Sequence, residues 1–135
     1  MAFVESFGTL VAEVVDISAP TATSIQVHRV ACAVDCGLAV NPNAVEAQMQ
    51  GGIAHGLAAA LWGEQKFVAG KPTARNFNSY RMLRLREMPH VDVTIVNSGE
   101  ALGGIGEPGV PPVAPAVANA YFRLTGKRVR ALPLI

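Results

Sequence analysis

The sequence predicts an α+β fold in which a mixed or antiparallel sheet packs against two main helices. Residues 9–17 and 24–34 are rich in strand-forming residues and lie close together in the chain, which indicates a hairpin. Residues 91–96 alternate apolar and polar side chains, as a half-buried strand does. Residues 41–61 and 111–125 instead repeat apolar side chains at helical spacing.

Composition indicates a folded, apolar chain of one domain or part of one. Half of the 135 residues are hydrophobic and 16% are charged. The formal net charge is +1 and the basic residues are scattered, which excludes the basic face of a nucleic-acid-binding protein. No apolar run reaches the roughly 18 residues of a membrane span. The first residues carry no basic segment, so we expect no signal peptide.

The first helix begins at Asn41 and Pro42, a good N-cap followed by a residue suited to the first helical position. One apolar stripe runs along it at every fourth residue. Its members are Val45, Met49, Ile53 and Leu57. A second stripe contains Gln48 and small residues. Its small members are Gly52, Gly56 and Ala60.

Glycine inside a helix is unfavourable by about 1 kcal/mol relative to alanine, so the glycines of this helix require a reason. The pattern leaves two reasons open: close packing against a neighbouring sheet, or close packing against a large ligand. The second helix ends at Gly126, and we expect its buried face to contain five residues. These are Val113, Val117, Ala120, Tyr121 and Leu124.

The remaining segments give weaker predictions. We expect a turn at residues 19–22, a strand at 63–68 and a turn at 69–72. Residues 75–89 are expected to form a loop with a short helix, and residues 128–132 a returning strand.

The two cysteines, Cys32 and Cys36, are expected to be small buried hydrophobic residues. Two cysteines cannot form a disulfide framework. A metal site would need two more ligands, and the nearby His28 and His55 do not have zinc-ligand spacing. We therefore expect no metal ligands in this chain.

Gly104, Gly106 and Gly109 match the G-x-G-x-x-G pattern of dinucleotide-binding proteins. That pattern needs an acidic residue about 20 positions later to bind the ribose, and no acidic residue follows Glu107. Glu107 would also repel the pyrophosphate. A nucleotide site is therefore disfavoured.

Glu107 is the candidate catalytic group, because it is a single carboxylate within a run of glycines and prolines. In an apolar pocket it would be poorly hydrated and would suit a general base. The alternative is an ordinary exposed acid near the start of a helix, where the helix dipole favours negative charge. The residue pattern alone leaves both readings open.

Three segments in order resemble the molybdenum-cofactor-binding large subunit of the xanthine dehydrogenase and aldehyde oxidase family. They are residues 34–42 (VDCGLAVNP), 47–57 (AQMQGGIAHGL) and 103–112 (GGIGEPGVPP), the last continuing through 118–120. The likeness covers nearly the whole chain and is closest to the isoquinoline 1-oxidoreductase beta-subunit branch. Residues 108–112 differ from the sequence that follows the glutamate in xanthine-type members, which favours that branch.

The resemblance implies that Glu107 is the catalytic base and that Gln48 contacts the pterin. It also implies that the backbone of Gly104, Ile105 and Gly106 approaches the metal centre. The implied reaction is hydroxylation of an aldehyde or an aromatic N-heterocycle, with water as the oxygen source. Molybdopterin would be bound in the complete enzyme, and iron–sulfur clusters would belong to a partner, because two cysteines cannot hold them.

Since the family's large subunit is several times longer, we expect residues 1–135 to be a single C-terminal fragment of a molybdopterin-binding domain. Its implied partners are the remainder of the large subunit, an iron–sulfur small subunit and a small-molecule substrate. The isolated chain would then be inactive and would leave an exposed apolar patch. The compartment stays open between bacterial cytoplasm and periplasm. The alternative function is a non-catalytic binding or interaction module that keeps the scaffold without the cofactor.

Overall fold

A four-stranded sheet forms the centre of the protein, whose computed structural model describes residues 1–21 and 24–134. The strand order is β1-β2-β3-β6. The strands are β1 (Ala2–Ser6), β2 (Thr9–Thr21), β3 (Ser24–Asp35) and β6 (His90–Val96). β1, β2 and β3 pair antiparallel, and β6 is parallel to β3. The predicted α+β fold with a mixed sheet is confirmed.

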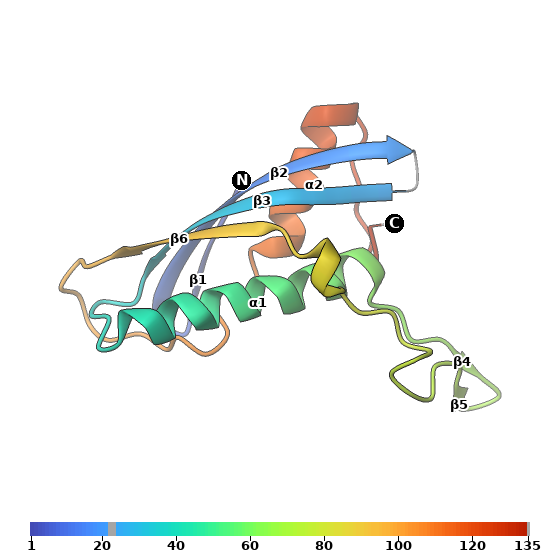
Figure 1. The fold of residues 1–135 in the computed structure, drawn as a ribbon, viewed down its shortest axis with the longest axis horizontal. Helices are drawn as coiled ribbons and strands as arrows, with labels where there is room; N and C mark the ends of the chain where they lie inside the picture. Colours follow the sequence, from blue (N-terminus) through green and yellow to red (C-terminus); the bar gives the residue numbers. More distant parts are fainter. Residues whose placement is uncertain (22–23, 135) are drawn as a thin grey trace.

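The parallel pairing of β3 and β6 requires a crossover, because parallel strands cannot be joined by a tight turn. Helix α1 (Pro42–Trp62) provides it and runs along the sheet beside β6, as Figure 1 shows. The Asn41 side chain accepts a hydrogen bond of 3.2 Å from the Ala44 backbone N–H, so the predicted N-cap is confirmed.

Helix α2 (Val113–Thr125) contacts β1, β2 and α1. It begins two residues later than predicted, because Pro111 lies in the preceding turn and Pro112 is the N-cap. Gly126 ends the helix in the left-handed region with φ 73°, where glycine is favoured, and its N–H donates to the Phe122 carbonyl at 2.7 Å.

One hydrophobic core joins the inward face of the sheet to both helices. The predicted stripe of α1 is buried throughout: Val45, Met49, Ile53 and Leu57. In α2 the buried residues are Val113, Ala116, Val117 and Tyr121. Leu124 is exposed, so its predicted burial is wrong; it lies in the last turn of α2, beyond the edge of the core. The predicted burial of Cys32 and Cys36 is confirmed, and both thiols are free.

At the chain ends and turns one strand was missed and two predictions are wrong. β1 was not expected, because its five residues alternate too briefly to stand out from the N-terminal sequence. Residues 19–21 continue β2 across an irregular register instead of turning, and the rest of that predicted turn lies outside the described residues. Residues 128–132 are not a strand; the following Leu134 is fixed instead by its N–H bond to the Ala60 carbonyl, at 2.8 Å.

Residues 63–89 form an arm that projects from the end of α1, at the lower right of Figure 1. The predicted strand at 63–68 is reduced to β4 (Phe67–Val68), which pairs with β5 (Lys71–Pro72). The expected turn lies between them, and the expected short helix is the 3-10 turn η1 (Leu85–Glu87). No helix of the described residues is long and apolar enough to cross a membrane.

Candidate functional site

A cavity of about 520 Å³ lies between α1 and the glycine-rich loop that precedes α2. Its walls come from three parts of the chain that are far apart in sequence: the turn after β1, one face of α1, and the loop. The lining residues are Ser6, Phe7, Gln48, Gly51, Gly52, His55, Gly106, Glu107, Val110 and Pro111. The fold therefore brings the predicted residues Gln48, Gly106 and Glu107 to one site.

Gln48 joins the helix wall of the cavity to the loop wall. Its side-chain Nε2 donates a hydrogen bond of 3.2 Å to the Gly106 carbonyl oxygen. The oxygen of the same amide has no hydrogen-bond partner in the described part of the chain, and it remains available to a bound molecule. Because Gly106 directly precedes Glu107, this bond also restrains the backbone that carries the carboxylate.

The backbone beyond Glu107 is fixed by packing. Pro108 is fully buried, and Gly109 lies so close to α1 that an added Cβ would be 3.3 Å from the Met49 sulfur. The Val110 N–H donates to the Glu107 carbonyl at 2.9 Å and closes a turn. Buried packing thus holds the backbone after Glu107, and the hydrogen bond from Gln48 to Gly106 holds the backbone before it, as a reacting group requires.

The glycines of α1 have two different explanations. A Cβ on Gly52 would lie 3.4 Å from Gly109, and one on Gly56 would lie 2.8 Å from Val113. These two glycines therefore allow close packing against the loop and the start of α2, rather than against a sheet. A Cβ on Gly51 would meet nothing within 4 Å, and Gly51 lines the cavity. Of the described glycines in α1, Gly51 is therefore the one that leaves space for a ligand.

The Glu107 side chain is exposed, so the described residues by themselves do not remove water from it. The cavity that Glu107 lines is open to solvent. A carboxylate on the wall of an open cavity is desolvated only when a ligand or another polypeptide closes it.

Gly104 and Ile105 do not line the cavity. The Gly104 N–H donates to the Phe7 carbonyl at 2.8 Å, and its carbonyl accepts from the Thr9 hydroxyl at 2.7 Å. Ile105 is partly buried against the core. Gly104 thus attaches the loop to the β1–β2 hairpin, Ile105 packs it against the core, and together they hold its Gly106–Glu107 end in place.

His55 was missed as a cavity residue, although the sequence contained a signal for it. It lies seven residues after Gln48, which is two helical turns, so the two side chains share a face of α1. The sequence reasoning considered His55 only as a metal ligand. Among the described residues there is no group of three or more His, Cys, Asp or Glu that could hold a metal ion.

Glu13 is the second residue that the sequence analysis missed. It is fully buried in β2 opposite Cys32, and neither carboxylate oxygen has a hydrogen-bond partner among the described residues. Burial raises the pKa of Glu13 to about 8, so this carboxyl is mostly neutral at pH 7. Burial, together with the charge of Glu13, raises the pKa of the Cys32 thiol to about 12. Both groups face the core and lie outside the cavity.

The family model for the molybdopterin cofactor-binding domain matches residues 2–89. The chain is 40% identical to isoquinoline 1-oxidoreductase subunit beta of Brevundimonas diminuta, over 82% of this chain and 14% of that protein. It is 39% identical to a protein of Gluconacetobacter polyoxogenes named membrane-bound aldehyde dehydrogenase [pyrroloquinoline-quinone], over 75% of this chain and 13% of that protein. The resemblance to the isoquinoline 1-oxidoreductase branch is confirmed.

The fold is similar to that of quinoline 2-oxidoreductase from Pseudomonas putida 86, with a TM-score of 0.78. The match covers 93% of this chain and 17% of that structure, at 22% sequence identity. The chain therefore spans less than a fifth of the length of the proteins it matches.

Proposed function

The chain belongs to the molybdopterin cofactor-binding domain family, and from this premise we propose that it supplies the catalytic base and part of the cofactor site of a molybdenum hydroxylase. The observation that supports this proposal is the convergence of Gln48, Gly106 and Glu107 on one cavity. The relatives named above act on an aromatic N-heterocycle or an aldehyde, and we extend these two substrate classes to this chain.

The residues of the cavity fit a pterin cofactor. A pterin presents amide and amine groups at its edge, which suit the free oxygen of the Gln48 amide. Gly51 removes a side chain from the helix surface at this point, so a flat group can approach the backbone. When bound, the cofactor would supply two-electron redox chemistry at molybdenum.

Glu107 would accept the proton that is released when an oxygen atom from water is transferred to the substrate. An exposed carboxylate is a weak base, and closure of the cavity by cofactor and substrate would remove water and strengthen it. His55 lies on the helix wall of the same cavity and would present a ring nitrogen to the cofactor or substrate.

We propose two polypeptide partners, the remainder of a large subunit and an iron–sulfur small subunit. The described residues contain two cysteines, both buried in the core, and a single iron–sulfur cluster uses four thiolates. Electrons would therefore have to leave the cavity through clusters that another polypeptide holds.

The test is Glu107→Gln in the complete enzyme, which keeps the shape of the side chain and removes the base. Turnover is expected to fall by at least about 100-fold, the usual contribution of a general base, while the molybdenum content stays that of the wild type. The matched control is Glu100→Gln, an exposed acid of the same loop that does not line the cavity. Unchanged turnover in Glu107→Gln would refute the role of Glu107.

Metal analysis separates this proposal from the alternative of a module that binds no cofactor. Wild-type enzyme should contain about one molybdenum per chain. Gln48→Ala should lower the molybdenum content. The matched control is Gln50→Ala, which should not lower it, because the Gln50 side chain bonds to Glu46 on the same helix and does not line the cavity. Absence of molybdenum from the assembled wild-type protein would support the alternative.

A further inference from the structure

The arm at residues 63–89 differs from the rest of the protein in charge. It contains six of the eleven Lys and Arg residues and two of the ten Asp and Glu residues. Both of its acids are already paired: Glu64 lies 3.2 Å from Lys66, and Glu87 lies 2.8 Å from Arg81. The arm is therefore strongly basic, and the body of the protein is acidic.

The base of the arm is fixed to the body. The Arg81 guanidinium stacks on the Trp62 ring at 4.0 Å from its centroid and pairs with Glu87 at 2.8 Å. This pairing lowers the pKa of the Glu87 carboxyl. Glu87 also accepts the Arg84 N–H at 2.9 Å, and Leu83 packs against the core. These contacts hold the arm in one direction relative to α1.

The outer part of the arm is ordered by its own hydrogen bonds but touches little else. The Thr73 N–H donates to the Lys66 carbonyl at 2.9 Å and closes the β4–β5 hairpin. Large apolar side chains of the arm are nevertheless left in solvent: Phe77 of the outer part is 94% exposed, and Leu85, nearer the base, is 95% exposed. Ordered backbone with exposed apolar side chains is typical of a surface that another polypeptide covers.

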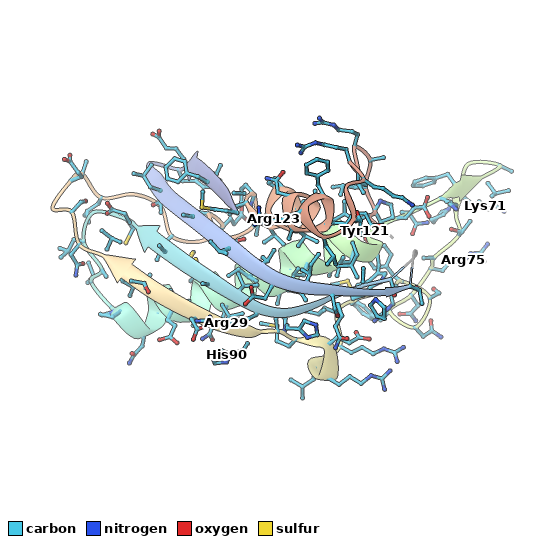
Figure 2. All side chains as sticks on the ribbon, turned by 90° about the horizontal axis from the view of Figure 1, so that it is seen from above. Arg29, Lys71, Arg75, His90, Tyr121 and Arg123 are labelled. Carbon is cyan, nitrogen blue, oxygen red and sulfur yellow. The ribbon has the colours of Figure 1, made fainter. Side chains whose placement is uncertain are left out.

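The outer part of the arm carries the cations Lys71 and Arg75. In the part of the chain that the structure describes, no ion pair includes Lys71 or Arg75. Figure 2 shows both side chains at the far end of the arm, away from Tyr121 and Arg123 of α2. Unpaired arginine beside exposed aromatic and methionine side chains is the composition of protein–protein interfaces, and guanidinium binds carboxylates bidentately.

We propose that the arm docks onto an acidic, apolar-lined surface of another polypeptide segment in the assembled enzyme. Phe77 and Leu85 would enter apolar hollows of that surface, and Lys71 and Arg75 would pair with carboxylates around them. The apolar side chains are spread along the arm rather than gathered at one tip, which favours a protein surface over a membrane. The docking does not depend on the cofactor, so it can fail or hold independently of the proposed catalysis.

The test is photo-crosslinking in the complete enzyme, with benzoylphenylalanine incorporated in place of Phe77. Mass spectrometry of the crosslinked peptides is expected to find a segment outside residues 1–135 that is enriched in Asp and Glu. Leu124, an exposed apolar residue of α2, is the control position and should not reach that segment.

The charge contribution is tested with Lys71→Glu combined with Arg75→Glu. The crosslink from position 77 is expected to decrease about 10-fold, the effect of losing two charge pairs and gaining repulsion, and wild-type crosslinking should fall with added salt. Arg123→Glu, on α2, should leave it unchanged. The proposal is overturned if position 77 crosslinks to nothing, or only to a segment without acidic excess. It is also overturned if the arm instead binds vesicles containing phosphatidylserine and the charge reversal abolishes that binding.

Discussion

At the scale of single residues, Glu13 shows how burial changes the chemistry of a side chain. The sequence pattern already carried the information: Glu13 lies between Val11 and Val15 on the inward side of β2, because strand residues two apart share a face. What the sequence did not show is that neither Glu13 oxygen has a hydrogen-bond partner within residues 1–21 and 24–134. Burying a charged carboxylate without a hydrogen-bond partner is costly, so such a group favours its neutral, protonated form.

Glu13 should make the stability of the protein fall as pH rises. The unfolded chain loses this proton near pH 4.5 and the folded chain near pH 8, so between these values the folded state binds one more proton. The free energy of unfolding should therefore decrease by up to about 1.4 kcal/mol per pH unit and become level above pH 8.

Glu13→Gln should remove this dependence, because its amide does not titrate. Urea unfolding at pH 5, 6 and 7 measures the slope in the wild type and in the variant. Glu5→Gln, an exposed residue of the neighbouring strand β1, should keep the wild-type slope. Equal slopes in wild type and Glu13→Gln would contradict the burial of an unpaired carboxyl.

At the scale of elements, α1 combines a structural side with a cavity side. Its start and its apolar stripe could be predicted from the sequence, because capping and helical periodicity are local properties. The reason for each glycine could not be predicted, since it depends on what lies opposite. Gly56 faces Val113 of α2, whereas Gly51 faces the open cavity, although both belong to the same helix.

Alanine substitutions should separate these two sides. Gly51→Ala gains helix propensity and meets no atom within 4 Å, so the free energy of unfolding should rise by about 0.5–1 kcal/mol. In Gly56→Ala the new methyl group would overlap Val113, and overpacking should exceed the gain in propensity by about 1–2 kcal/mol. Chemical denaturation measures the free energy of unfolding of both variants. A Gly56→Ala protein as stable as the wild type would show that α1 and α2 can move apart without a loss of stability.

At the scale of the whole molecule, the walls of the candidate site come from distant parts of the chain. The turn after β1, the middle of α1 and the loop before α2 meet at the cavity. A ligand that binds only this folded arrangement stabilises it by mass action. The prediction that residues 1–135 are a single C-terminal fragment stays a prediction.

Removal of the molybdenum cofactor should therefore lower the melting temperature of the complete enzyme. A cofactor present at about 100 times its dissociation constant contributes about 2.7 kcal/mol. The difference in melting temperature between loaded and cofactor-free enzyme should shrink in Gln48→Ala and persist in Gln50→Ala. Calorimetry of the enzyme from cofactor-deficient cells provides the comparison. A cofactor effect that Gln48→Ala leaves intact would place the pterin contact elsewhere.

The sequence by itself determined the strands of the hairpin, β6, both helices and the family resemblance, because strand alternation, capping and short motifs depend on neighbouring residues. Only the tertiary structure decided that Gln48 reaches Gly106, that Gly104 attaches to Phe7, that Glu107 is exposed and that Glu13 has no partner in the part of the chain that is described. Each of these depends on which distant segments pack together, and hydration and hydrogen bonding are properties of that packing rather than of the local sequence.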